Sequence, residues 1–150
     1  MPIHRNSPEN QFRSYVESRI RFRISALIQM LNYVGLECVR EARTKRRYTD
    51  QTGNLRSSTG YCILYNGSVV HQGGFEAVKP TATKGPASGR KLMNQLISQN
   101  PAGIVLIVVA GMDYAAYVEA KGLNVLDTSE IMAKKLVRRT LKRLGFKANC

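Results

Sequence analysis

One apolar stripe dominates the first third of the sequence and limits what the chain can fold into. Its members recur at spacings of three and four residues, as on one face of an α-helix: Phe12, Val16, Ile20, Ile24, Leu27, Leu31, Val34 and Cys38. Ser7, Pro8 and Glu9 supply a capping hydroxyl, a proline for the first helical position and a carboxylate near the positive end of the helix dipole. We therefore predict a helix from about residue 8 that extends as far as Arg46.

Such a helix is long for a chain of 150 residues. At 1.5 Å per residue, roughly 35 residues span about 50 Å, which exceeds what a compact domain of this size needs. We therefore expect part of the helix to pack on another subunit. Gly35 interrupts the stripe and weakens the prediction that the helix is straight.

A β-hairpin is predicted after this helix. Residues 60–65 have the alternation of a strand, and Asn66 and Gly67 form the strongest short-range signal for a two-residue hairpin turn. The following SVVHQ segment continues as a second strand, so we predict strands at about 60–65 and 68–73.

Residues 79–89, KPTATKGPASG, combine prolines, glycines and small polar residues with almost nothing to bury. This composition predicts a mobile loop, which is either a contact arm or disordered. A short helix is predicted over 90–99. The β-branched run 104–109 predicts a strand buried on both faces.

The last element is predicted to be an amphipathic helix. Asp127 or Thr128 is its expected cap, Glu130 lies in its first turn and Gly145 ends it. Its expected buried stripe consists of Met132, Ala133, Leu136, Val137, Leu141 and Leu144. The chain is therefore predicted to be one α+β domain over residues 1–150, with a long first helix, a small, mainly antiparallel sheet and a C-terminal amphipathic helix.

The charge is strongly positive, with 23 basic residues against 10 acidic ones and a formal net charge of +13. Two basic rows without an intervening carboxylate follow the outer face of the last helix: Lys134, Arg138 and Lys142, and Lys135, Arg139 and Arg143. A second basic segment contains Arg43, Lys45, Arg46 and Arg47. Either these are solvated surfaces or they bind an acidic partner or a polyanion. We favour the second interpretation, because mixed charges would solubilise the chain at less electrostatic cost.

Several function classes have no support in the sequence. Cys38, Cys62 and Cys150 are odd in number, widely spaced and without neighbouring histidines, which indicates neither a disulfide framework nor a zinc site and favours a reducing compartment. No Ser–His or Cys–His arrangement accompanies His4 or His71, and no phosphate loop is visible. We therefore expect no cofactor, no metal and no catalytic residues.

A membrane or export role is not predicted either. The start of the chain lacks the apolar core of a signal peptide, and the most apolar run, 102–111, is half the ~20 residues that a spanning helix requires. The expectation is a protein without membrane contact.

Two alternatives remain open. Asp113, Glu119 and Lys121 match in letters the carboxylate and Glu-x-Lys cluster of metal-dependent nucleases, although their segment is typical of one short helix. The basic segments also fit sequence-non-specific binding of nucleic acid through phosphate contacts, since no base-reading motif accompanies them. Of the two, the nucleic-acid-binding protein is the stronger alternative.

The segment YTDQTGNLRSST, residues 48–59, is interpreted as a structural joint rather than a site. Thr52 is expected to cap a short turn, and Gly53 and Asn54 tolerate left-handed backbone angles. Leu55 is expected to enter the core, while Arg56 and Ser57 tie the turn to its neighbours.

With its order of elements, the chain resembles the neck and tail-completion proteins of tailed bacteriophages. The resemblance rests on the Thr-Gly-Asn-Leu-Arg segment 52–56 and on the Tyr-x-x-Tyr-Val-Glu segment 114–119, and it covers roughly residues 10–145. It implies an α+β fold without a cofactor and a ring of identical subunits that joins the portal side of the capsid to the tail. The implied partners are the chain itself and other neck, portal or tail proteins, with non-specific DNA contact left open. The implied location is the virion, after assembly in the host cytoplasm. The resemblance explains neither the positive charge nor the 79–89 segment.

Overall fold

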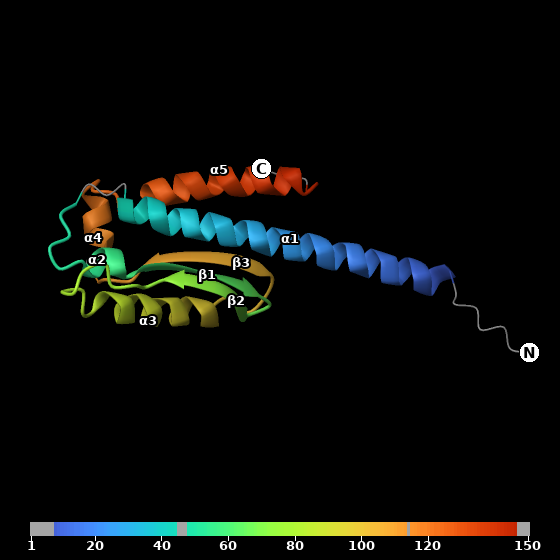
Figure 1. Cartoon of the computed structure of the whole chain (residues 1–150), viewed down its shortest axis with the longest axis horizontal. Helices are drawn as coiled ribbons and strands as arrows, with labels where there is room; N and C mark the ends of the chain where they lie inside the picture. Colours follow the sequence, from blue (N-terminus) through green and yellow to red (C-terminus); the bar gives the residue numbers. More distant parts are fainter. Residues whose placement is uncertain (1–7, 45–47, 114, 147–150) are drawn as a thin grey trace, which may run out of the picture.

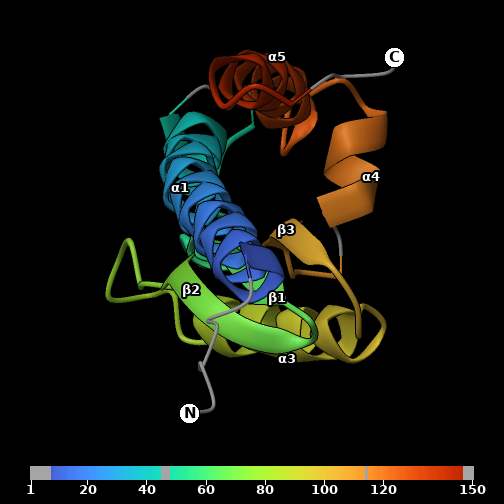
Figure 2. The same ribbon diagram turned by 90° about the vertical axis from the view of Figure 1, so that its right-hand side faces the viewer.

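The structure, a computed structural model, describes residues 8–44, 48–113 and 115–146. Its elements are α1 Pro8–Thr44, α2 Asn54–Ser57, β1 Thr59–Tyr65, β2 Ser68–Gly74, α3 Gly85–Ser98, β3 Ile104–Ala110, α4 Ala115–Ala120 and α5 Asp127–Arg143. Helix α3 covers one face of the three-stranded sheet, α1 covers the other, and α5 packs on α1 (Figures 1 and 2). The predicted α+β class is confirmed.

The sheet is antiparallel with the order β2-β1-β3, so the predicted hairpin supplies its central strand. Asn66 and Gly67 have φ values of 50° and 83°, the positive angles that a type I′ hairpin turn requires at both central positions. In β1, Cys62 lies between Gln72 of β2 and Ile107 of β3. The predicted strand at 104–109 is confirmed and has apolar neighbours on both faces, but only Ile107 and Val109 are buried and its other residues are half-buried.

Two apolar layers form the core, one on each face of the sheet. Toward α3, the buried cluster consists of Cys62, Leu64, Phe75, Met93, Ile107 and Val109. Toward α1, it consists of Leu31, Val39, Tyr61 and Ile63, with half-buried partners that include Val137 of α5. Burial raises the pKa of the Cys62 thiol to about 11.

Glycines create a slot for one large ring in each layer. The Tyr61 ring lies against Gly35 of α1 and Gly73 of β2, at positions where a Cβ would overlap the ring. On the opposite face, Phe75 occupies the space beside Gly60 and Gly89 in the same way. The close approach of α1 and α3 to the sheet therefore depends on residues without side chains.

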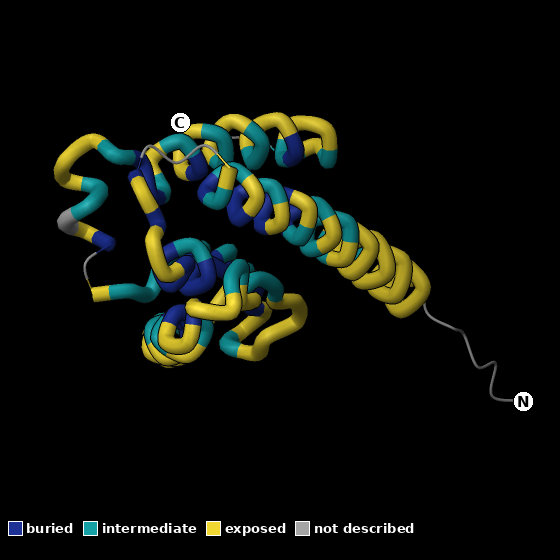
Figure 3. Tube along the Cα trace, turned by 60° about the vertical axis from the view of Figure 1, so that its left-hand side comes forward, coloured by how far each residue is buried: buried dark blue, intermediate teal, exposed yellow. Residues whose placement is uncertain are grey.

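Helix α1 is much longer than the sheet that it covers, and its N-terminal half extends beyond the rest of the domain (Figure 1). The predicted stripe is buried only in the C-terminal half, at Leu31, Val34 and Cys38, whereas Phe12 and Ile20 are exposed (Figure 3). One chain therefore covers only part of the apolar stripe, and the expected packing of the rest on another subunit stays a prediction. Of the predicted helix, residues 45–46 lie outside the described residues.

The predicted loop 79–89 is wrong from residue 85 onward. Helix α3 begins at Gly85 with Pro86 in its first turn, and Gly85 and Gly89 are buried. The side chain of Asn54 accepts the backbone N–H groups at the start of helix α3. Within the segment, Lys79 and Thr81 donate side-chain hydrogen bonds to backbone carbonyls of residues 50–52. The prediction failed because it relied on the low apolar content of the segment. Glycines that are buried against backbone, as Gly85 and Gly89 are, do not contribute to such a measure.

Helix α5 packs on α1, and its Val137 contacts the apolar cluster between α1 and the sheet. The expected buried stripe is only half-buried, and the fully buried side chains of the helix are Ser129 and Thr140. The Ser129 hydroxyl donates to the Cys38 carbonyl at 2.9 Å, and the Cys38 thiol lies 3.7 Å from the Ser129 carbonyl. Burial, with smaller contributions from Glu37 and Glu41, raises the pKa of that thiol to about 11. Across the described part of the chain, no helix combines the length and apolarity needed to cross a membrane.

Candidate functional site

The joint between α1 and β1 is organised by the carboxylate of Asp50. One carboxylate oxygen accepts the Gly53 N–H at 3.1 Å, and the other accepts the backbone N–H and the Nε–H of Arg56 at 3.3 and 3.0 Å. The Asp50 side chain is 3 % exposed and that of Arg56 is 18 % exposed, so this ion pair is largely withdrawn from water. The sequence interpretation included Asp50 in the joint at 48–59 but assigned it no role.

Asn54 connects the joint to helix α3. Its side-chain Oδ1 accepts the N–H groups of Lys84 and Gly85 at 3.0 and 2.9 Å, which satisfies free donors at the start of that helix. The Asn54 N–H in turn donates to Thr52 Oγ1 at 3.3 Å, so the predicted capping by Thr52 is confirmed. Of the two residues expected to tolerate left-handed angles, Gly53 adopts one, with φ of 81°, whereas Asn54 begins helix α2.

Serines on the other side of α2 extend these connections. Ser57 Oγ accepts the Val78 N–H at 2.9 Å, and Ser58 Oγ accepts the Gly111 N–H at 3.1 Å after β3. Leu55 is buried beneath them, as predicted. The joint therefore bonds to the segments before α3 and after β3, and its polar groups are used for structure.

Replacing Gly53 with alanine is expected to lower the free energy of unfolding by about 1 kcal/mol or more. A Cβ at a φ of 81° is strained, and it would lie 3.1 Å from Val78 Cγ2. Thermal or urea unfolding measures the loss. Unchanged stability together with a lost binding activity would instead identify this stretch as a ligand site.

Arg43 is a structural residue in this environment. Its guanidinium donates to the carbonyls of Arg56 and Thr59 at 3.3 and 3.4 Å, and burial lowers its pKa while nearby Glu76 opposes that shift. The sequence predicted that Arg43 binds a polyanion, because it shows the charge of this residue but not the backbone carbonyls to which its guanidinium donates. The other members of that segment, Lys45, Arg46 and Arg47, lie outside the described residues.

The basic rows of α5 form an exposed charged surface. All six side chains are exposed: Lys134, Lys135, Arg138, Arg139, Lys142 and Arg143. The sequence interpretation gave them no counter-ion, which is wrong for Lys134, since its Nζ lies 2.7 Å from Glu130 and lowers the pKa of that carboxyl. The other five form no ion pair with any described carboxylate. We call these five the α5 basic face.

Glu119 caps helix α5. Its carboxylate accepts three consecutive backbone N–H groups, from Val125, Leu126 and Asp127, at 2.5, 2.7 and 2.8 Å. The expected cap by Asp127 is therefore wrong; the pKa of that carboxyl is raised by the neighbouring Glu119 charge. Thr128 is not the cap either, since its own N–H donates to the Asn124 side chain.

The nuclease alternative draws no support from this arrangement. Asp113 is exposed before α4, and the Glu119 oxygens that would hold a metal ion already accept backbone donors. Among the described residues, no three His, Cys, Asp or Glu side chains gather where they could share an ion. Two positions of the 114–119 segment, on which the resemblance to neck proteins rests, lie outside what the structure describes: residue 114 and the side chain of residue 117.

We expect Glu119→Ala to lower the free energy of unfolding by about 1–2 kcal/mol through the lost cap, and to change no hydrolytic activity. Unfolding curves and incubation of the unchanged protein with DNA and Mg²⁺ or Mn²⁺ test both parts. Metal-dependent cleavage that disappears in Glu119→Ala or Lys121→Ala would establish the nuclease.

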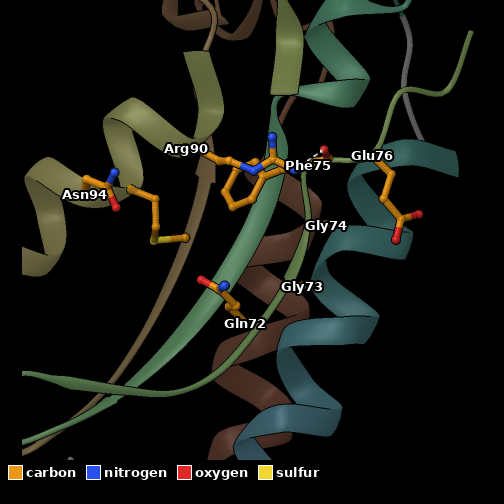
Figure 4. Close-up of a pocket in the computed structure, with 8 residues that line it drawn as sticks. Gln72, Gly73, Gly74, Phe75, Glu76, Arg90 and Asn94 are labelled. Carbon is orange, nitrogen blue, oxygen red and sulfur yellow. Dashed lines mark hydrogen bonds between the residues drawn. The ribbon is translucent and has the colours of Figure 1, made fainter. Parts of the chain in front are cut away.

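A groove of about 440 Å³ lies between the outer edge of β2 and helix α3 (Figure 4). Phe75 and Met93 line it together with polar side chains, and Arg90 donates to the Phe75 carbonyl at 3.3 Å. Glu76 points away from the groove toward α1. Arg90 is already bonded to backbone, and the Glu76 side chain is directed toward α1. The groove therefore does not bring together an acid, a base and a nucleophile.

Comparison with known proteins adds no relative: no family model, no curated protein and no solved structure matches this chain.

Proposed function

We propose that the chain is a structural protein of a tailed-phage virion, which forms a ring of identical copies at the head–tail neck and joins the portal or connector to the tail. The observation that carries this proposal is helix α1, whose N-terminal half extends beyond its own domain and is largely exposed (Figure 3). Large apolar side chains of this half, such as Phe12 and Phe22, lie in solvent. A single copy leaves this surface uncovered, so the chain is built for assembly. The likeness of the 52–56 and 114–119 segments to neck proteins supports the same proposal.

The joint fits a structural role as well. Asp50, Asn54 and Arg56 are buried or half-buried, and their side chains bond to one another or to backbone within the joint and at the start of α3. A catalytic loop needs polar atoms directed at a substrate, whereas these atoms are directed at the chain itself. The neighbours proposed for the ring are portal, connector and tail proteins.

The α5 basic face is the proposed contact with an acidic neighbour or with DNA that passes the neck. Reversing Lys135, Arg139 and Arg143 to glutamate is expected to leave the monomer folded, because all three are exposed, and to stop incorporation into particles. Screening over about 8 Å at physiological salt predicts that assembly also weakens steeply as salt rises. Electron microscopy of particles with labelled protein measures incorporation at the neck.

A charge-conserving triple variant, Lys135→Arg with Arg139→Lys and Arg143→Lys, is the matched control and should assemble normally. Normal incorporation of the glutamate variant at low and high salt would show that the face is only a solvated surface. Absence of the labelled, unchanged protein from the neck of the particles would contradict the proposed function itself.

Sequence-non-specific binding of nucleic acid is the second candidate, favoured by the five cations of the α5 basic face. It predicts binding to any DNA duplex that falls sharply between low and physiological salt and is lost in the glutamate variant. A protein that binds DNA in this way and forms no ring would support this candidate over the first.

A further inference from the structure

A second stripe of side chains runs along the face of α1 opposite to its buried residues. Its positions alternate in steps of three and four residues and repeat every seven, as in the seam of a coiled coil. We call this the outer stripe, and its members are Phe12, Tyr15, Arg19, Phe22, Ala26, Gln29, Tyr33, Leu36 and Arg40. At 1.5 Å per residue it is about 42 Å long.

The outer stripe holds a large share of the apolar surface that the fold leaves in water. Of the ten exposed large hydrophobic side chains among the described residues, five belong to it. Their exposed fractions are 50–69 %: Phe12, Tyr15, Phe22, Tyr33 and Leu36. Neither the sheet nor α5 covers them, because those layers pack on the inner residues, such as Leu31 and Cys38. An apolar stripe of this length on a helix that already has one buried face indicates a second helical partner.

We propose that the partner is α1 of a second copy of this chain, packed antiparallel along the outer stripe. The stripe is complementary to itself in that orientation. When Ala26 of one copy lies opposite Gln29 of the other, Phe22 meets Tyr33 in the adjoining layer. The smallest member of the stripe is then near the two-fold axis, where the helices come closest, and aromatic pairs lie on both sides of it.

The arginines decide the orientation. A parallel, in-register pair would place Arg19 against Arg19 and Arg40 against Arg40, which costs free energy through like-charge repulsion. The antiparallel pair places Arg40 over the Tyr15 ring and Arg19 beside Leu36 and Glu37. Both side chains already make related contacts within one chain, since the Arg19 guanidinium lies 5.9 Å from the Tyr15 ring centroid and Arg40 lies 3.8 Å from Glu37. Polar members of an otherwise apolar seam are known to specify orientation in this way.

The antiparallel pair also gives the protruding half of α1 a place to pack. In that arrangement residues 12–22 of one copy cover residues 33–43 of the other, a half of the helix that is backed by the sheet and α5 (Figures 1 and 2). Each overhang is thus supported by the rigid part of its partner. The pairing is proposed for the free protein and does not depend on the role at the neck. A two-fold pair closes on itself, so the ring proposed at the neck requires a further contact between pairs or the release of the pair.

Light scattering coupled to size exclusion tests the pair. The unchanged protein at micromolar concentration should have at least twice the mass of one chain, and Phe22→Glu should reduce that mass by separating the copies while the helix content stays the same. Ile131→Glu is the matched control, because Ile131 is equally exposed but lies on α5, and it should leave the mass unchanged. A single-chain mass for the unchanged protein, or a mass that Phe22→Glu does not alter, would overturn the proposal.

Cysteine cross-linking tests the orientation with the stripe otherwise intact. In chains that carry Cys150→Ser, Tyr15→Cys and Arg40→Cys should each give little disulfide dimer alone and a strong dimer when mixed, since position 15 of one copy faces position 40 of the other. Dimer from Tyr15→Cys alone, without a gain on mixing, would indicate a parallel pair and overturn the proposal. An unchanged protein that does not pair but is incorporated normally at the neck would remove this inference and leave the proposed function standing.

Discussion

Replacing Asp50 with alanine is expected to lower the free energy of unfolding by about 3 kcal/mol, the largest effect of any single change considered. The change leaves the Arg56 guanidinium without its carboxylate and removes the acceptor of two backbone N–H groups. Breaking a buried ion pair on one side costs about 3–5 kcal/mol, and the lower end applies because Arg56 is 18 % exposed and regains some water. Chemical denaturation at neutral pH measures the difference.

One further variant separates the hydrogen bonds of Asp50 from its charge, and a second serves as a control at an exposed ion pair. Asp50→Asn keeps one carbonyl oxygen for the Gly53 N–H and should lose less stability than alanine does. Glu17→Ala removes an exposed ion pair with Arg21 on α1 and should cost only about 0.3–0.5 kcal/mol. If Asp50→Ala cost no more than Glu17→Ala, the bonds of the joint would contribute nothing to the fold.

The elements with strong local signals were the ones that sequence reasoning predicted best. The Asn66–Gly67 turn and the β-branched run at 104–109 correspond to β1, β2 and β3 within one or two residues. The start of α1 at Pro8 also agrees with the prediction. In each case the deciding interactions lie within a few residues, so the sequence shows both partners at once.

The errors come from contacts that lie outside the few residues on which local sequence rules depend. Helix α3 begins at Gly85 because the Asn54 side chain, some 30 positions earlier, accepts its first N–H groups. Similarly, Glu119 rather than Asp127 caps α5. Local capping rules consider only the residues next to a helix, and no spacing pattern identifies a donor or acceptor that the tertiary fold brings in.

The candidate site was predicted only in part, because some of its contacts also depend on the tertiary fold. The joint at 52–56 was recognised from its turn chemistry, but its centre, Asp50, lies outside that motif and is identifiable only through its three bonds. For α5 the sequence predicted the charged face correctly. It overstated the burial of the opposite face, since a hydrophobic pattern shows which side turns inward and not how many elements cover it.

Gly35→Ala should destabilise the fold by about 1–3 kcal/mol, although helix propensity alone predicts the opposite sign. Alanine in a helix is favoured over glycine by about 1 kcal/mol. At Gly35, however, the new methyl group would overlap the Tyr61 ring, which Gly73 confines from its other side. Overpacking a buried site typically costs about 1–3 kcal/mol. Ser25→Ala, at an exposed position of the same helix, is the control and should be neutral or slightly stabilising.

The Tyr61 ring can be tested as the cause by repeating Gly35→Ala in two backgrounds. Tyr61→Leu removes the ring, so the added methyl group gains space and Gly35→Ala should cost clearly less there than in the natural chain. Tyr61→Phe removes only the hydroxyl that donates to Asn32 Oδ1 and keeps the ring, so the cost of Gly35→Ala should persist. Equal costs in both backgrounds would place the strain in the backbone of α1. Rescue by leucine and not by phenylalanine would show that the glycine is required for α1 to lie against the sheet.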